Sequence, residues 1–112
     1  MFIEIATNKE ELRGIIGYTI FDYEGVFMRP CWSDEYCRRF DEVASRINYP
    51  VVLAYTESLD PFFVGEWRII DLDVDLYEVM RDWKERKEEM RKTLEEKYRK
   101  ILDDAFYEEI PS

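Results

Sequence analysis

The first part of the chain alternates short apolar stretches with helical spacing, which predicts small strands and helices in turn. Residues 2–6 alternate apolar and polar side chains with the two-residue period of a strand. The T-x-x-E pattern of residues 7–10 is a capping box, and it predicts a short helix that ends at Gly17. Residues 18–28 have the pattern of a hairpin that turns within residues 22–25.

A second helix is predicted between Ser33 and Asn48, where apolar residues recur every three to four positions. Ser33 suits the N-cap position because its hydroxyl can accept a hydrogen bond from an amide of the first turn. Asn48 can adopt the left-handed conformation that ends a helix. The apolar face of this helix consists of Tyr36, Cys37, Phe40, Val43, Ala44 and Ile47.

Two further strands are predicted after this helix. The continuous apolar run at residues 51–55 is typical of a central strand that is covered on both faces. Residues 58–61 are expected to form a loop, and residues 62–74 a strand on which Asp71 and Asp73 share one face.

The longest predicted helix begins after Asp75, whose carboxylate suits the N-cap position. The sequence contains no glycine or proline from this point to Pro111. We expect a helix from Leu76 to about residue 106, with a length of about 46 Å. A domain of this size has a radius of gyration of about 13 Å, so the helix must project, bend or be covered at its far end.

The order of these elements predicts an α+β fold. We expect a small mixed or antiparallel sheet of about four to five strands, two short helices and one long C-terminal helix. The α+β body would comprise residues 1–75, and the long helix with its acidic tail residues 76–112. Both are expected to belong to the same single domain.

The long helix carries two groups of apolar residues on either side of a charged middle. The first group, within residues 76–83, can pack on the sheet. The second, from Leu94 to Phe106, can pack on the same domain, dock a partner or form a homodimer, the commonest oligomer. The residues that we assign to association through this helix are Trp83, Met90, Leu94, Tyr98, Ile101 and Leu102.

The charge adds a constraint on the partners. The 112 residues include 26 acidic and 16 basic side chains, for a net charge of -10. Such a charge opposes direct binding to nucleic acid or to an anionic membrane, and it suits a partner with a basic surface. The chain has no histidine, which excludes histidine-based triads and general bases. We expect no enzymatic activity and no cofactor.

Two groups of residues could carry chemistry, and each has a simpler interpretation. Without an export signal, Cys31 and Cys37 are expected to be reduced and packed, with a disulfide or redox role as the alternative. Asp71, Asp73 and Asp75 could hold Mg²⁺ or Mn²⁺, but alternate strand residues lie about 7 Å apart, which is wide for one ion. A solvent-facing strand edge followed by a helix cap is the simpler interpretation, and an electrostatic interaction surface is a third.

These observations favour a small acidic protein-protein interaction protein of the cytoplasm. The specific hypothesis is an inhibitor that occludes the basic nucleic-acid-binding surface of a nuclease. In size and charge the chain is similar to acidic inhibitors that phages and mobile elements direct against restriction or CRISPR nucleases, a similarity of composition alone. The alternative is a structural or assembly protein that oligomerises through its long helix. The acidic residues assigned to partner binding are Asp71, Asp73, Asp103, Asp104, Glu108 and Glu109.

Overall fold

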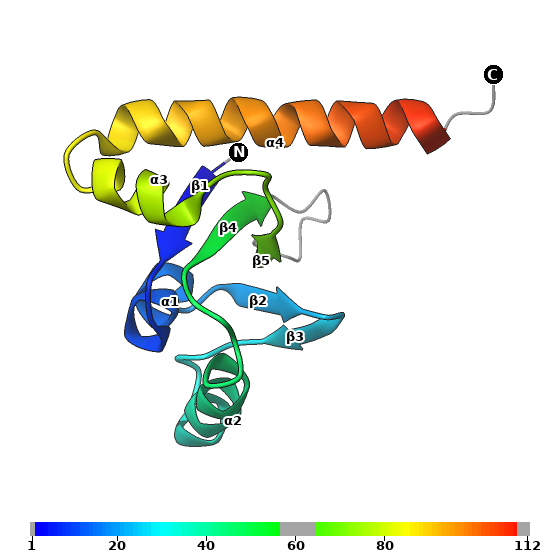
Figure 1. Cartoon of the computed structure of the whole chain (residues 1–112). Helices are drawn as coiled ribbons and strands as arrows, with labels where there is room; N and C mark the ends of the chain where they lie inside the picture. Colours follow the sequence, from blue (N-terminus) through cyan, green and yellow to red (C-terminus); the bar gives the residue numbers. More distant parts are fainter. Residues whose placement is uncertain (1, 57–64, 110–112) are drawn as a thin grey trace. The chain divides into compact units, whose positions relative to one another are not determined.

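The computed structural model describes residues 2–56 and 65–109, with side chains up to Ile101 (Figure 1). The chain divides into two compact units, which we call the sheet unit (residues 1–71) and the helical unit (residues 72–112). The loop predicted at residues 58–61 lies outside the described residues. That the two units form a single domain stays a prediction.

The sheet unit contains a five-stranded mixed sheet in the order β1-β4-β5-β2-β3. Strands β2 and β5 run parallel, and the other neighbouring pairs run antiparallel. This arrangement confirms the predicted α+β class and the small mixed sheet. The elements of this unit are β1 (Phe2–Ala6), α1 (Lys9–Ile16), β2 (Ile20–Tyr23), β3 (Val26–Met28), α2 (Asp34–Ala44), β4 (Val51–Thr56) and β5 (Glu66–Ile70).

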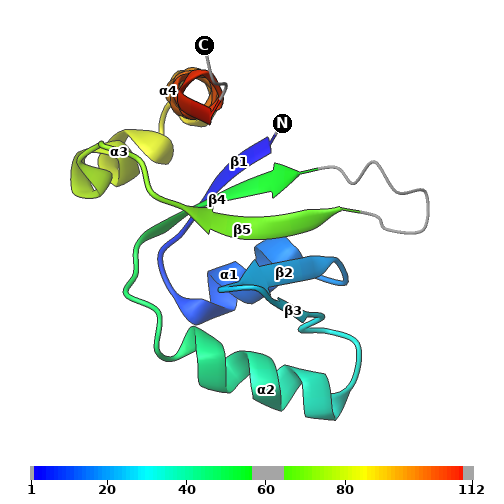
Figure 2. The ribbon, with the colours of Figure 1, turned by 90° about the vertical axis from the view of Figure 1, so that its right-hand side faces the viewer.

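Both helices of the sheet unit pack on one face of the sheet, as Figure 2 shows. The strand register places alternate residues of each strand on that face, where they meet the apolar sides of α1 and α2. Residues 51–54 of β4 are all buried, which confirms the prediction of a central, buried strand. The buried cluster consists of Ala6, Leu12, Ile16, Phe21, Met28, Phe40, Ala44, Ile47, Val51, Leu53 and Trp67.

The predicted hairpin is confirmed, and its turn is formed by Glu24 and Gly25. Both residues have positive φ, 53° and 84° respectively. Positive φ at both central residues is the geometry that matches the twist of two strands joined by a two-residue turn. The carboxylate of Asp22 accepts a hydrogen bond from the backbone N–H of Gly25 at 3.0 Å, which fixes the turn from its first strand.

The N-cap of α1 is one residue later than the capping box of Thr7 and Glu10 predicted. The side chain of Asn8 accepts a hydrogen bond from the N–H of Glu11 at 2.9 Å, and the Glu11 carboxylate accepts hydrogen bonds from Thr7. Asparagine is at least as good an N-cap as threonine, so the box shifts without loss. The predicted end of the helix at Gly17 is confirmed.

The second helix begins at the predicted N-cap, Ser33, but it ends at Ala44, before the predicted Asn48. The N–H groups of Arg46 and Ile47 bond to the third residue back, so the chain tightens and leaves the α-helical path. The hydroxyl of Tyr49 donates to the carbonyl oxygen of Ala44 at 3.0 Å and satisfies this freed helix end.

The strand predicted at residues 62–74 is too long: β5 ends at Ile70. In the antiparallel pair of β4 and β5, residues after Ile70 would have to bond to the segment before β4. That segment contains Pro50, which has no N–H to donate, so the ladder ends there. After β5 the chain turns tightly at residues 72–74, where the N–H of Val74 donates a hydrogen bond to the carbonyl oxygen of Leu72 at 2.8 Å. Asp71 and Asp73 therefore do not share the face of a strand.

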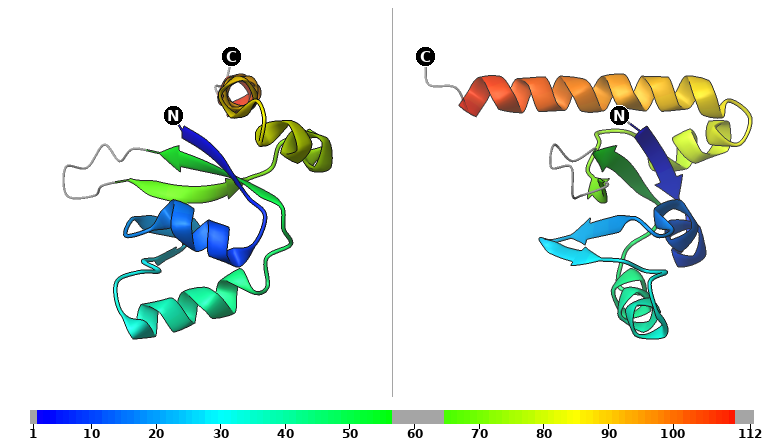
Figure 3. Two further views of the ribbon diagram at one scale, coloured as in Figure 1. Left: turned by 90° about the vertical axis from the view of Figure 1, so that its left-hand side faces the viewer. Right: turned by 180° about the vertical axis from the view of Figure 1, so that it is seen from behind.

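The helical unit consists of two helices, α3 (Leu76–Trp83) and α4 (Lys87–Glu109), so the prediction of one continuous helix is wrong. The N-cap at Asp75 is confirmed, because its carboxylate accepts hydrogen bonds from two amides of the first turn. Residues 84–86 break the helix, and α4 reverses its direction relative to α3 (Figure 3). A helix with a polar middle gains little burial by continuing, whereas the reversal brings α4 into contact with α3.

Among the described residues, no helix combines the length and apolar character that a membrane crossing requires.

Candidate interaction surface

Much of the acidic excess occupies positions where a carboxylate stabilises a helix. The first turn of a helix carries the positive end of the helix dipole, so negative side chains there are favourable. The local fold therefore explains the placement of these acids. They are Glu10, Glu11, Asp34, Glu35, Glu78, Glu88 and Glu89.

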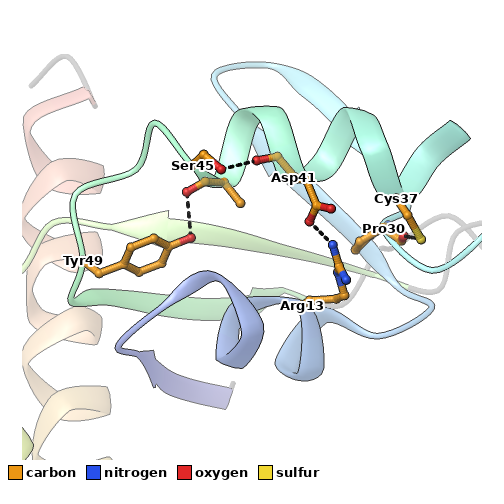
Figure 4. A network of polar contacts seen from close by, with 7 residues as sticks. Arg13, Pro30, Cys37, Asp41, Ser45 and Tyr49 are labelled. Carbon is orange, nitrogen blue, oxygen red and sulfur yellow. Dashed lines mark hydrogen bonds and ion pairs between the residues drawn. The ribbon is translucent and has the colours of Figure 1, made fainter. Parts of the chain in front are cut away.

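Other carboxylates of the sheet unit are paired with arginines. Asp41 of α2 forms an ion pair with Arg13 of α1, which joins the two helices (Figure 4). Arg68 of β5 pairs with Glu66 and lies 3.8 Å from a carboxylate oxygen of Asp22. These groups are partly exposed, so each pair contributes modestly to stability. The charge of Asp41 is neutralised by Arg13, whereas Arg68 is shared by two carboxylates and neutralises only one negative charge of the two.

The four predicted acids near the end of α4 lie far from the positive end of the helix dipole. The backbone is helical to Glu109, and the last turn contains no basic residue. The C-terminal end of a helix carries the negative end of the dipole, so Glu108 and Glu109 in the last turn oppose it, whereas Asp103 and Asp104 lie more than one turn from the end. The side chains of these four residues lie outside the described ones. From the backbone alone, the helix dipole does not favour Glu108 and Glu109.

The three predicted aspartates between the sheet and α3 have separate environments. Asp71 is exposed at the end of the sheet unit, and Asp73 is exposed in the helical unit. Asp75 holds the N-terminus of α3. Within residues 2–56 and 65–101, whose side chains the structure describes, no three cysteine, aspartate or glutamate side chains gather as metal ligands.

Trp83, one of the residues predicted to mediate association, makes its contacts within the helical unit. The Lys87 ammonium lies 5.7 Å and the Arg91 guanidinium 5.8 Å from the centre of its ring. These contacts join the end of α3 to the start of α4. The side chain of Trp83 is half-buried.

The remaining residues assigned to association differ in exposure. Leu94 is only 1% exposed, whereas Ile101 is 43% exposed. Met90 and Tyr98 are half-buried, and the side chain of Leu102 lies outside the described residues. Ile101 is therefore the most accessible apolar residue of this set among the described side chains.

The two cysteines are free and half-buried, as the sequence predicted. The thiol of Cys37 donates to the carbonyl oxygen of Pro30 at 2.7 Å, which holds α2 against the loop before it (Figure 4). The geometry gives Cys37 a packing role.

The sheet unit also contains a depression that the sequence did not predict. It has a volume of about 320 Å³ and lies where β2 and β5 end, β4 begins and the chain leaves α2. The sequence marked Glu24 and Asn48 only as turn and helix-end residues. The sequence feature that could have indicated this depression is the pair of charged residues, Glu24 and Arg46, which lie in turns next to apolar strand ends. The lining residues are Asp22, Tyr23, Glu24, Arg46, Ile47, Asn48, Val51 and Ile69.

Tyr49 follows the lining residue Asn48 in the sequence, and the pKa of its phenol is shifted from the usual value. Burial, and then the nearby Glu10 carboxylate, raises the pKa of its phenol above the usual 10.0. Both effects disfavour the phenolate. The hydroxyl therefore stays a hydrogen-bond donor to Ala44 through the neutral pH range.

The aromatic residues that flank turns or loop ends in the sequence are Tyr18, Tyr23, Tyr55, Phe62 and Phe63. Of the turn-flanking aromatics, Tyr18 is exposed, whereas Tyr23 and Tyr55 are half-buried. Phe62 and Phe63 lie outside the described residues. The other exposed aromatics among the described residues are Phe2 of β1, Phe27 of β3, Trp32 before α2, Tyr36 of α2 and Tyr77 of α3.

No protein-family model, curated protein or solved structure matches this chain. The inference of function therefore rests on the residues and their arrangement.

Proposed function

We propose that this chain binds the basic surface of a protein partner and inhibits that partner by occlusion. The observation that carries the proposal is the acidic end of α4, where Glu108 and Glu109 oppose the helix dipole, Asp103 and Asp104 lie about one turn earlier, and the last turn has no base. A residue that is unfavourable for its own helix becomes favourable when it meets a cationic surface. The acids at Asp71 and Asp73 are exposed and available for the same purpose.

The proposed target is the nucleic-acid-binding surface of a nuclease inside the cell. Surfaces that hold phosphate backbones are rich in lysine and arginine, so they attract a chain with a net charge of -10. Such attraction raises the association rate and favours this partner over acidic ones. Restriction and CRISPR nucleases are the proposed class, with the protein acting in the cytoplasm as a product of a phage or mobile element.

The test is displacement of labelled duplex DNA from purified restriction and CRISPR nucleases by the full chain. We expect concentration-dependent displacement from at least one nuclease. The variant Asp71→Asn/Asp73→Asn/Glu108→Gln/Glu109→Gln should weaken it by about tenfold or more, because exposed charges set the attraction.

A matched variant controls for the loss of net charge. Glu10→Gln/Glu42→Gln/Glu85→Gln/Glu96→Gln removes the same number of charges from exposed positions. We expect it to retain most of the displacement. Equal loss in both variants would reject the assignment of the surface, and no displacement from any nuclease would reject the proposal.

Self-association through α4 is a second candidate, favoured by the 43% exposure of Ile101 on this helix. Light scattering across a dilution series distinguishes the two. A dimer that resists salt and is lost in Ile101→Glu supports assembly, whereas a monomer at all concentrations removes it.

A further inference from the structure

The depression in the sheet unit has an apolar floor and a charged rim. Ile47 and Val51 are buried beneath it, and the half-buried Ile69 completes the floor. The exposed side chains of Glu24 and Arg46 lie at the rim. A ligand that fits this arrangement has an apolar stem and a charged end.

The two rim charges are not neutralised within the described part of the chain. The carboxylate of Glu24 and the guanidinium of Arg46 take part in no ion pair or side-chain hydrogen bond there. Asp22 adds a second carboxylate, 3.8 Å from Arg68 and bonded to the Gly25 amide. The lining therefore carries two acids and one base, and it favours a cation.

The backbone at Glu24 supports a role for its side chain. Its φ of 53° lies in the left-handed region, which glycine, asparagine and aspartate adopt more readily than glutamate. Hairpin formation alone would favour one of those residues. The glutamate brings a longer side chain, and therefore a carboxylate with more reach, to the rim of the depression.

From these observations we propose that the depression is a socket for a long basic side chain, lysine or arginine, of the protein partner. The alkyl stem would lie on Ile47, Val51 and Ile69, and the cationic end would meet the carboxylate of Glu24. The half-buried ring of Tyr23 adds a surface on which a cation can rest. This inference rests on the proposed function only in identifying the partner as basic.

The dimensions favour a partner's side chain over a free small molecule. The volume of about 320 Å³ is at the lower limit of small-molecule sites, which enclose most of their ligand. Here Glu24, Arg46 and Asn48 are all exposed, so the depression is open to solvent. An open socket of this kind suits a side chain whose remaining surface is covered by the protein that carries it.

The test uses two probes of the same shape, N-butylguanidinium and its neutral analogue N-butylurea. Each is titrated into the full chain while the backbone amide resonances of Glu24, Gly25, Ile47 and Asn48 are followed by NMR. We expect saturable shifts at these amides with the cation, with a dissociation constant on the order of 1–10 mM. The urea should bind at least about threefold more weakly.

Three variants locate the charge effect. Glu24→Gln should weaken binding of the cation about threefold or more, and Arg46→Gln should strengthen it, because a like charge is removed. Glu42→Gln, on α2 outside the depression, removes the same charge as Glu24→Gln and should leave binding unchanged. The amide spectra also report whether each variant is folded.

Equal binding of the two probes, an equal effect of Glu24→Gln and Glu42→Gln, or shifts that do not saturate would each overturn the socket. These results are independent of the nuclease experiment, since no partner is present. If the probes do not bind as expected, the DNA-displacement experiment still tests the proposed function through its own variants. If no DNA is displaced, the measured probe affinities still test the socket.

Discussion

Glu24 occupies a backbone conformation that its side chain does not favour, and this makes it the most informative single residue of the sheet unit. The hairpin needs positive φ at Glu24 and Gly25, and the neighbouring Asp22 stabilises the turn through the Gly25 amide. Glycine supplies such geometry without steric cost, whereas glutamate does not. A residue that stabilises the turn better than Glu24 would therefore lack the long carboxylate side chain that the proposed binding site uses.

We expect Glu24→Asn to increase the free energy of unfolding by about 0.5 kcal/mol, because asparagine suits this position of a two-residue hairpin. Urea denaturation followed by tryptophan fluorescence measures the change. The same substitution shortens the side chain and should weaken binding of N-butylguanidinium. A decrease in stability would show that the Glu24 side chain supports the fold.

Tyr49→Phe should lower the free energy of unfolding by about 0.5–1 kcal/mol at pH 7, since the hydrogen bond to Ala44 is lost. The cost is small because the Ala44 carbonyl also accepts from the N–H of Ile47. Folding raises the pKa of the Tyr49 phenol above 10.0, so the folded state holds this proton more tightly. The stability that this tighter proton binding gives the folded state is fully present below pH 10 and is lost as the pH rises through the folded-state pKa.

The difference in the free energy of unfolding between the wild type and Tyr49→Phe should therefore stay constant up to about pH 10 and narrow over the pH range above it. Denaturation at a series of pH values measures it. A difference that stays constant across this range would contradict the raised pKa.

At the scale of elements, α4 combines a favourable beginning with an unfavourable end. Glu88 and Glu89 lie in its first turn, where the helix dipole favours them. Ion pairs of Glu88 with Arg91 and of Glu89 with Arg86 add to the stability of this end. The other end has acids and no base in its last turn, so the helix is stabilised asymmetrically.

Neutralising that end should stabilise the helix. We expect Asp103→Asn/Asp104→Asn/Glu108→Gln/Glu109→Gln to increase helix content and to stabilise the helical unit by about 1 kcal/mol at low salt. Far-UV circular dichroism during thermal unfolding measures both. A gain in stability together with a loss of DNA displacement is the expected combination, and a loss of both would assign these acids a structural role.

Elements with a strong local signal were predictable from the sequence. The N-caps at Ser33 and Asp75 and the turn before Gly25 follow from side chains that bond to their own backbone. The break at residues 84–86 was not predictable, because it contains no glycine or proline and depends on contact between α3 and α4. The depression also needed the structure, since β2, β4, β5 and the end of α2 come together only in the fold.

For the whole molecule, both units contribute to the negative charge. Residues 1–71 contain 13 acidic and seven basic residues, a net charge of -6, and residues 72–112 contain 13 and nine, a net charge of -4. Helix starts and ion pairs explain many of these acids, and the end of α4 is the main exception. We propose that this remaining charge binds a basic partner.

The most direct test of that claim is the salt dependence of the complex with a nuclease that releases its DNA. The dissociation constant is measured by titration calorimetry at about 50, 150 and 300 mM NaCl. Because salt screens exposed charges, we expect the affinity to fall by about tenfold or more across this range. An affinity that does not change with salt would contradict the claim.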